Sequence, residues 1–386
     1  MHRVFGCTMA FKLTIPARIN ILGNPSDANE GDFATISSAV DIFAYATIEK
    51  AARIFIEQRE SIDCSSEIKL QEEYDNRTIP LPYTGMVDLA KGGVNRLSRY
   101  SPEFRNKLAT HGFRITLWSE VPRQSGLGGS SLFVLLTLVG LRTLYELDPI
   151  FHNDYVLAEL AQQVEAKELG IHCGFSDRYV PLFGGIAYLD YHGKLHQNSL
   201  HEEPYVTYER LDPWMSEDLP LVTVCSGVEH DSGDVHGRMR PRYIEEYDAW
   251  VAQGGETPPM VRFMSTAYET ACRGKAALLQ RDWETFGTLM NQNHRVVDEM
   301  MTYCGFSDGA GWANNLLIEA ALTNGALGAK LTGAGSGGSV FAITKPGKEL
   351  YLKKVWEKTV AEAGLEKARI YQPHIVRQGL KIESIP

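Results

Sequence analysis

The sequence has 386 residues, of which 44% are hydrophobic and 22% are charged, as in ordinary globular proteins of roughly two to three domains. Its 38 Lys and Arg residues stand against 48 Asp and Glu residues, and this formal net charge of -10 argues against a protein that coats nucleic acid. The six cysteines form no Cys-x-x-Cys pair, so free thiols are expected rather than a zinc ribbon or a disulfide scaffold. No apolar run long enough for a signal peptide opens the chain, and we expect a cytoplasmic protein without a membrane anchor.

The first half of the chain is rich in predicted strands. Residues 11–22 and 34–48 are β-branched and apolar around a polar loop, which predicts strand, loop and strand. The apolar stretch 132–141 is too short to span a bilayer and predicts a buried helix that ends near residue 145. Three more strands are expected over 53–58, 113–118 and 184–191, with an amphipathic helix over 153–169.

The second half predicts mostly helices around a few strands. A Pro-, His- and acid-rich segment over 195–220 reads as a crossover between domains. After it we expect strands at 221–227 and 368–373, and helices over 240–252, 261–280, 282–301, 310–324 and 347–364. The pattern indicates an α+β protein with two domains, residues 1–200 and 201–386.

A Gly/Ser loop, PRQSGLGGSS at residues 122–131, leads into the apolar helix. Small residues let backbone N–H groups approach a ligand closely, and the start of a helix adds unpaired donors and partial positive charge. The loop could therefore bind phosphate, although a simple N-capped turn would have the same composition. It is not a P-loop, because no Gly-Lys-Ser/Thr sequence closes it.

A second glycine loop, KLTGAGSGG, occupies residues 330–338. Gly333, Gly335 and Gly338 satisfy the dinucleotide pattern Gly-x-Gly-x-x-Gly, but the next residues alternate like a strand instead of opening a helix. A hairpin, or a close approach of backbone to ligand, fits the sequence better.

Two further segments carry candidate side chains. Glu165 precedes Asp177 by twelve residues. In such a pair, one carboxylate could bind a divalent metal while the other accepts a hydroxyl proton. Arg18 and Asp27 flank a predicted tight turn, GNPSD at residues 23–27. For any random pair of acids, simple solvation is the commoner role.

Together and in this order, the four segments resemble the GHMP kinase superfamily, named for galactokinase, homoserine kinase, mevalonate kinase and phosphomevalonate kinase. The family's Arg and Gly-x-x-x-Asp match Arg18 and residues 23–27, and its third motif matches residues 330–338. Its Pro-x-x-x-Gly-Leu-Gly-Ser-Ser matches residues 122–130, except that Gly129 stands in place of one of the serines. This resemblance implies a two-domain α+β fold, with a ribosomal-protein-S5-domain-2-like N-terminal half and a ferredoxin-like C-terminal half.

The resemblance also implies site residues. Asp177 falls where the family places its catalytic base and Arg18 beside it, while Ser130 and Glu165 fall where it places its Mg2+ ligands. ATP would lie along both glycine loops, at Pro122, Ser125, Gly126, Leu127, Gly128, Gly129, Ser130, Ser131, Gly333, Gly335 and Gly337. The sugar kinases of the family place substrate partners where this chain has Asn24, Asp27, Gly333 and Ala334.

Departures from the family pattern narrow the expected substrate. Galactokinases show Gly-Glu-His-x-Asp in the first motif, whereas this chain has Asn24-Pro25, and Arg178 follows the base where the sugar kinases usually have Gln. Five segments look like those of the glucuronokinases, which phosphorylate the anomeric hydroxyl of D-glucuronate: residues 23–27, 121–131, 165–171, 176–185 and 231–236. The carboxylate of a uronic acid calls for a fixed cation. Arg178 is the first candidate by position, followed by Arg240, Arg242 and His236.

The leading hypothesis is an ATP- and Mg2+-dependent sugar kinase whose partners are small molecules, acting as a monomer or a homodimer. Alternatives keep the reaction and change the acceptor to a heptose phosphate, arabinose, galacturonate or an isoprenoid alcohol. A sugar and nucleotide sensor without turnover is a third possibility, because kinase folds can serve as regulators.

Overall fold

The fold was analysed in a computed structural model of the chain. It describes residues 10–29, 33–59, 67–194, 202, 204–215, 219–229 and 232–385. The predicted domain boundary at residues 200 and 201 lies outside these ranges, as do Cys7 and Cys64. Within them, Cys173, Cys225, Cys272 and Cys304 are free thiols. No helix in the described ranges combines the length and apolar character needed to cross a membrane.

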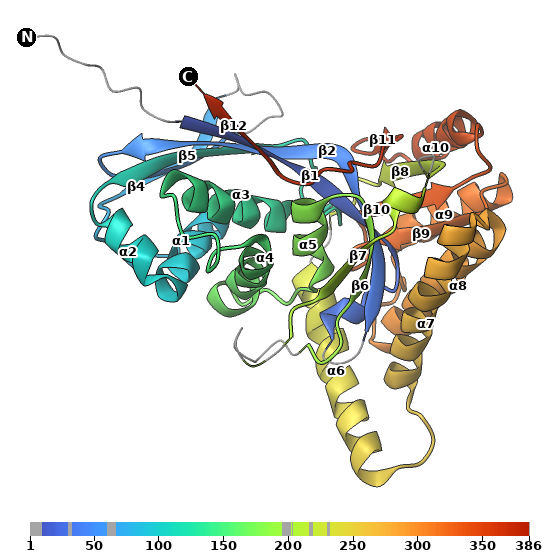
Figure 1. Cartoon of the computed structure of the whole chain (residues 1–386). Helices are drawn as coiled ribbons and strands as arrows, with labels where there is room; N and C mark the ends of the chain where they lie inside the picture. The colour runs from blue at the N-terminus through green and yellow to red at the C-terminus, as the bar shows by residue number, and fades with distance from the viewer. Residues whose placement is uncertain are drawn as a thin grey trace, which may run out of the picture.

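An eight-stranded sheet forms the larger layer of the molecule (Figure 1). Six strands follow the order β12-β1-β2-β5-β3-β4, and β6 pairs with β2 and β7. Antiparallel pairing of the two long strands β1 and β2 continues through two register shifts. The strands are β1 (Ala10–Leu22), β2 (Ala34–Ala51), β3 (Ile54–Arg59), β4 (Ile68–Tyr74), β5 (Gly112–Ser119), β6 (Ile186–Asp190), β7 (Thr207–Arg210) and β12 (Lys381–Ile385).

Helices α1 to α5 gather along one face of this sheet (Figure 1). One buried apolar cluster joins the helices to the sheet, and it includes Leu13 and Ile15 of β1, Ile48 of β2 and Leu135 of α3. The elements are α1 (Asp88–Tyr100), α2 (Pro102–Leu108), α3 (Gly129–Leu144), α4 (Asp154–Gln163) and α5 (Ser176–Phe183), with a 3-10 turn η1 (Ser26–Ala28) and a π-helix η2 (Val164–Glu168).

A second, four-stranded sheet has the order β11-β8-β10-β9, and each of its neighbouring pairs is antiparallel. Its strands are β8 (Leu221–Cys225), β9 (Gly328–Thr332), β10 (Ser339–Ile343) and β11 (Arg369–Tyr371). A separate apolar cluster, which includes Val224, Leu317 and Trp356, packs this sheet against α9 and α10. The helices of this half are α6 (Ser232–Gln253), α7 (Pro259–Gln280), α8 (Trp283–Tyr303), α9 (Trp312–Thr323) and α10 (Glu349–Glu362), with a 3-10 turn η3 (Asp212–Trp214).

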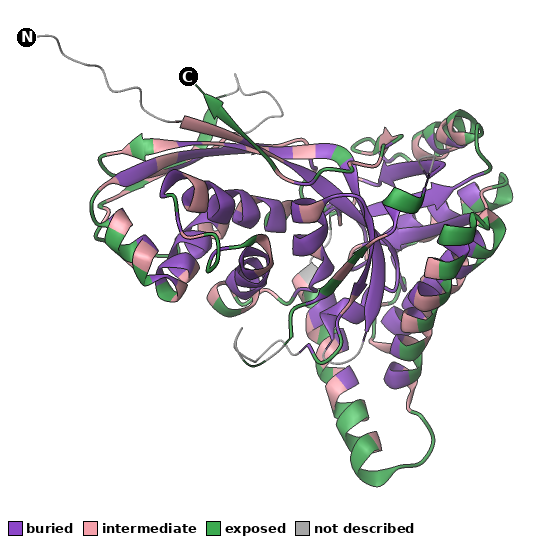
Figure 2. Cartoon of the chain, viewed as in Figure 1, coloured by how far each residue is buried: buried purple, intermediate pink, exposed green. Residues whose placement is uncertain are grey.

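The two sheets confirm the predicted α+β fold. The buried residues lie where the sheets and helices pack together, whereas the α6–α7 hairpin extends away from them with exposed residues at its tip (Figure 2). The sequence patterns missed several elements, among them β4, the short helices α2 and α5, and the strands β7 and β12. That last strand, β12, pairs with β1, and β7 pairs with β6, so two strands from residues 201–386 complete the sheet of the N-terminal half.

Candidate active site

Arg18 of β1 and Asp177 of α5 form an ion pair at the centre of the candidate site. Both Nε and Nη2 of the arginine lie 2.6 Å from Oδ1 of the aspartate. The remaining nitrogen, Nη1, donates to the carbonyl oxygen of Gly126 in the first glycine loop. Arg18 is 3% exposed, so its charge is held in one place. The structure thus brings the predicted base, its arginine and the predicted phosphate loop together.

The surroundings of Asp177 keep its carboxylate ionised. Burial acts to raise the pKa of Asp177, but the charges of Arg18 and Arg178, the hydrogen bond from Arg18 and the charge of His236 together hold the pKa below its ordinary value. A general base must be unprotonated before it can accept a proton. Asp177 is therefore in the state that proton abstraction requires.

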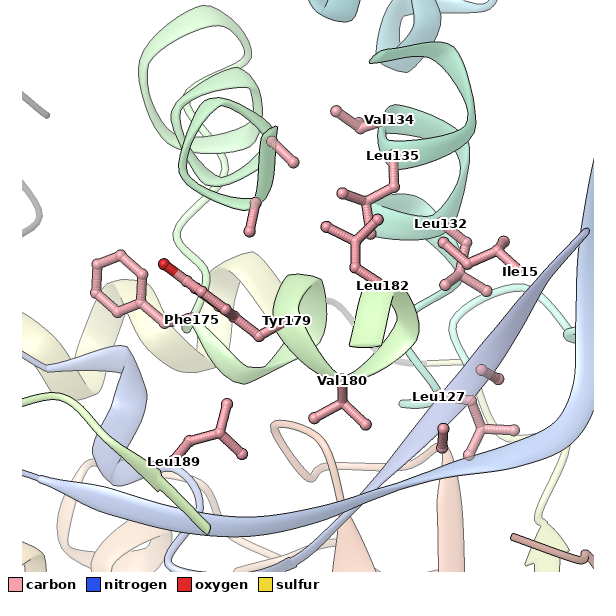
Figure 3. Packing of buried hydrophobic residues seen from close by; sticks show 14 of the residues in the cluster. Ile15, Leu127, Leu132, Val134, Leu135, Phe175, Tyr179, Val180, Leu182 and Leu189 are labelled. Atoms are coloured by element: carbon pink, nitrogen blue, oxygen red, sulfur yellow. The ribbon is translucent and has the colours of Figure 1, made fainter. Parts of the chain in front are cut away.

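The first glycine loop ends at the start of α3. Gly128, with φ +85°, is the residue before the helix, and its position has no side-chain capping hydrogen bond. The first backbone N–H groups of a helix lack partners within the helix, and here no capping side chain takes them. Leu127 and Leu132 belong to the same buried cluster as Ile15 and anchor the loop in the core (Figure 3). The arrangement suits an anion such as a phosphate.

The second glycine loop joins β9 to β10, which form an antiparallel pair, so the predicted hairpin is confirmed and the dinucleotide pattern is coincidental. Its residues Gly333, Gly335 and Gly337 all have positive φ. A Cβ on Gly126 would lie 2.6 Å from the Thr332 carbonyl oxygen, and one on Gly333 would lie 2.9 Å from the Cα of Gly126. The two glycine loops therefore touch, as sites that share one ligand would require.

Glu165 lies on the π-helix η2 rather than on a continuous α-helix. A π-helical turn adds one residue to the helix and changes the direction of the side chains it carries, and such turns are frequent at functional sites. Here the Glu165 carboxylate accepts a hydrogen bond of 2.6 Å from Ser131 Oγ, and its second oxygen lies 2.8 Å from Nη2 of Arg178. Of the two serines at the start of α3, Ser131 is the one that contacts Glu165, whereas Ser130 is exposed.

The residues present fit a Mg2+ ion that takes most of its ligands from a nucleotide. Among the described residues, no group of three or more His, Cys, Asp or Glu side chains could hold a metal by itself. Mg2+ is usually bound through one or two carboxylates together with phosphate oxygens and water. Glu165 accepts one hydrogen bond, from Ser131, and forms an ion pair with Arg178, which leaves lone-pair positions of its carboxylate for a metal.

Asp27 caps the helix that carries Asp177. Its Oδ2 accepts hydrogen bonds from the Phe175 and Ser176 amides, at 3.0 and 3.1 Å, and from the Ser176 hydroxyl at 2.8 Å. Burial, and then the charge of Asp177, raise the pKa of Asp27 above its ordinary value. The first turn of α5 is therefore fixed by a residue of the loop that resembles the family's substrate motif. Beyond this turn, Val180 and Leu182 pack α5 into the core (Figure 3).

Arg178 is less exposed than we expect of an arginine that binds the carboxylate of a ligand. Its side chain is fully buried, donates to the carbonyl oxygen of Gly174 and pairs with Glu165. Arg242, another arginine considered for a substrate carboxylate, contacts Glu246 and donates to the Tyr303 carbonyl oxygen at 2.7 Å. The Arg242 guanidinium is thus engaged by the protein. Arg178 has its charge paired with Glu165, but its Nε and Nη2 are buried without a hydrogen-bond partner among the described residues.

Several residues that support the site were not identified from the sequence. The side-chain oxygen of Asn20 on β1 accepts hydrogen bonds from the hydroxyl groups of Ser37 and Ser176. The backbone N–H of Asn20 donates to Thr332 Oγ1 at 2.9 Å. Lys330 lies at the start of the third motif and is completely buried. A lysine at an inward strand position could have been noticed in the sequence. The contacts of Asn20 left no local signal.

Known proteins resemble this chain along most of its length. The family models for the GHMP kinases N terminal domain and the GHMP kinases C terminal match residues 88–185 and 314–362. A protein named probable glucuronokinase 2 from Arabidopsis thaliana is 30% identical over 89% of this chain and 87% of its own length. The D-glycero-alpha-D-manno-heptose 7-phosphate kinase of Campylobacter jejuni is 23% identical over 89% and 92%.

The fold comparison agrees with the sequence comparison. Galactokinase from Lactococcus lactis, solved with galactose, superposes with a TM-score of 0.73 at 19% identity and covers 96% of this chain and 95% of its own. Mevalonate kinase from Methanococcus jannaschii superposes with a TM-score of 0.65 at 16% identity, covering 96% and 99%. With Arg18, Asp177 and both glycine loops in place, the chain belongs to the GHMP kinase family and is a phosphotransferase with an alcohol group as acceptor.

Proposed function

We propose that this protein transfers the γ-phosphoryl group of ATP to the anomeric C1 hydroxyl of D-glucuronate, giving glucuronate 1-phosphate and ADP. The observation that carries the reaction is the position of Arg18, which contacts both the phosphate loop at Gly126 and the carboxylate of Asp177. The choice of sugar is supported by two Arabidopsis relatives named glucuronokinases, which are 30% and 29% identical to this chain.

In this proposal each group has one task. The triphosphate lies against the start of α3 and the two glycine loops, where backbone N–H groups offset its charge. Asp177 accepts the proton of the sugar hydroxyl as the new oxygen–phosphorus bond forms and the bond between the γ-phosphorus and the β-phosphate oxygen breaks. Arg18 keeps Asp177 oriented and stabilises negative charge next to it. Catalysis would come chiefly from positioning and electrostatic stabilisation.

We propose Ser130 and Glu165 as the protein ligands of Mg2+. A bound Mg2+ would offset charge on the phosphates of ATP. Ser131 and Arg178 hold the Glu165 carboxylate from two sides, so its direction toward the phosphate loop is fixed before nucleotide binds.

The residues proposed to meet the sugar are Asn24, Asp27, Gly333 and Ala334, with a cation for its carboxylate. Because Arg178 is paired with Glu165, we propose that it acts mainly by orienting that side chain and by keeping Asp177 ionised. His236 of α6 is close enough for its charge to lower the pKa of Asp177, which makes it a stronger candidate for the sugar carboxylate than Arg242.

Mass spectrometry of the products formed from ATP, Mg2+ and a panel of sugars tests this proposal. The panel should contain D-glucuronate, galacturonate, arabinose, galactose and a heptose 7-phosphate, the last because of the Campylobacter relative. We expect glucuronate 1-phosphate as the main product. Phosphorylation of heptose phosphate or neutral sugars, with none of either uronate, would refute the assignment of a uronic acid but leave the kinase chemistry in place.

A further inference from the structure

Lys330 is a buried lysine that joins the two halves of the candidate site, and burial lowers the pKa of its amine well below the ordinary value. It lies on β9 directly before the second glycine loop, and its side chain is completely buried. Its Nζ donates to Asn24 Oδ1 at 2.6 Å, to the Leu331 carbonyl oxygen at 2.8 Å and to the Asn20 carbonyl oxygen at 3.4 Å. No Asp or Glu side chain in the described part of the chain lies within ion-pair distance of it. All three hydrogen bonds are to neutral oxygen atoms, and Nζ also lies 5.3 Å from the centroid of the Phe341 ring.

The contact with Asn24 fixes which way its amide group points. The amide oxygen faces Lys330, and Nδ2 donates to the Gly333 carbonyl oxygen at 3.1 Å. A carbonyl oxygen can only accept, so the two contacts independently demand the same orientation of the amide. The backbone of this loop is also held, because Asn293 accepts from the Gly23 amide at 3.0 Å and donates to the Asn24 carbonyl oxygen at 3.1 Å.

The fixed orientation determines what Asn24 can offer a ligand. Of the two N–H bonds on Nδ2, one is directed to Gly333, and the other has no hydrogen-bond partner among the described residues, although Asn24 is only 1% exposed in the absence of a ligand. The amide oxygen is directed to the buried amine of Lys330. A ligand that contacts this side chain must therefore present an acceptor oxygen, such as a hydroxyl or carboxylate oxygen.

We propose that Lys330 is a positioning residue that holds Asn24 as a hydrogen-bond donor toward an acceptor oxygen of the sugar. This inference rests on the proposed function, in which Asn24 contacts the substrate. Lys330 belongs to β9 of the second sheet, whereas Asn24 follows β1 of the first sheet. The lysine thus makes the sugar contact depend on the correct packing of the two halves.

Steady-state kinetics on Lys330→Met, Asn24→Ala and the double variant test the inference. Methionine is similar in length and carries no charge, so the pocket stays filled without an unpaired ion. Because a lost hydrogen bond costs about tenfold in binding, we expect each single variant to raise the sugar KM about tenfold while the ATP KM stays within about twofold. If Lys330 acts through Asn24, the double variant resembles Asn24→Ala alone.

Two further variants complete the test, one at Asn24 and one at a control lysine. Asn24→Asp retains an acceptor for Lys330 but loses the donor, so we expect its sugar KM to match that of Asn24→Ala, and this result does not depend on whether Lys330→Met folds. Lys91, which is also buried but pairs with Glu72 of β4 and Asp88 of α1, provides the control. Lys91→Met should lower the melting temperature without changing the sugar KM selectively.

Three results would overturn the inference. The first is a normal sugar KM in Lys330→Met when the sugar KM of Asn24→Ala is raised. The second is a double variant whose increase in sugar KM equals the product of the two single increases. The third is a normal sugar KM in Asn24→Asp. Failure of the proposed function looks different, because the wild-type enzyme would then phosphorylate no uronate, or Asn24→Ala would leave the sugar KM unchanged.

Discussion

Arg18 and Asp177 lie 159 positions apart in the sequence, yet two guanidinium nitrogens meet one carboxylate oxygen at 2.6 Å. The same arginine donates to the carbonyl oxygen of Gly126. One buried side chain therefore sets the position of the base relative to the phosphate loop. This arrangement makes Arg18 and Asp177 the first residues to test.

Asp177→Asn should lower kcat by about 10²- to 10⁴-fold, the usual contribution of a general base. The variant keeps the size of the side chain but cannot accept a proton at neutral pH. Single-turnover measurement of sugar phosphate formation reports this step directly. Nearly wild-type phosphoryl transfer by Asp177→Asn would show that another group takes the proton.

Arg18→Met should move the acidic limb of the pH–rate profile to higher pH. In the wild-type protein the pKa of Asp177 lies below its ordinary value of 3.8, so the base is already ionised and the rate should change little across neutral pH. Without the arginine, burial of Asp177 is opposed by less positive charge, and its pKa must rise. The profile of kcat/KM against pH measures the change, and an unshifted limb would contradict the proposed coupling.

Glu165→Gln should weaken the dependence on Mg2+ more than it weakens sugar binding. The amide retains the shape of the side chain but loses the charge that a metal prefers, and it leaves Arg178 without its buried partner. We expect a higher Mg2+ concentration at half-maximal rate and some loss of thermal stability. Ser131→Ala removes one contact to the same carboxylate and should show a smaller shift. An unchanged Mg2+ dependence in Glu165→Gln would argue against this ligand.

Gly333→Ala should raise the KM for ATP, because its Cβ would lie 2.9 Å from the Cα of Gly126 and push the two glycine loops apart. Gly325→Ala is a matched control. Gly325 has φ +87° against +80° for Gly333, so the backbone strain is similar, but a Cβ there meets nothing within 4 Å. Equal effects of the two variants on the KM for ATP would show that strain, and not contact between the loops, is responsible.

Asp27→Ala should destabilise the protein by about 1 kcal/mol or more, because the first turn of α5 loses its capping carboxylate. Asp27→Asn can still accept hydrogen bonds from this turn. Since burial and Asp177 already disfavour the charged form of Asp27, we expect a smaller loss with Asn. Thermal unfolding of the two variants provides the comparison. A larger loss in Asp27→Asn than in Asp27→Ala would contradict the capping role.

The sequence by itself determined the family, the strands of both sheets that alternate clearly, and the residue types needed for phosphoryl transfer. Motifs such as residues 122–131 and 330–338 can be recognised because glycine is required wherever backbone turns tightly or meets a ligand. The buried helix at residues 129–144 was equally visible, since continuous apolar character reports burial directly.

Only the tertiary structure decided which of these residues meet. That Ser131, and not Ser130, contacts Glu165 depends on a π-helical turn, which the sequence periodicity does not show. The buried pairing of Arg178 and the contact of Lys330 with Asn24 depend on the packing of α5 and β9 against β1. Local patterns report backbone preference and burial, whereas contacts between distant residues are fixed by strand register and by the fit of buried side chains.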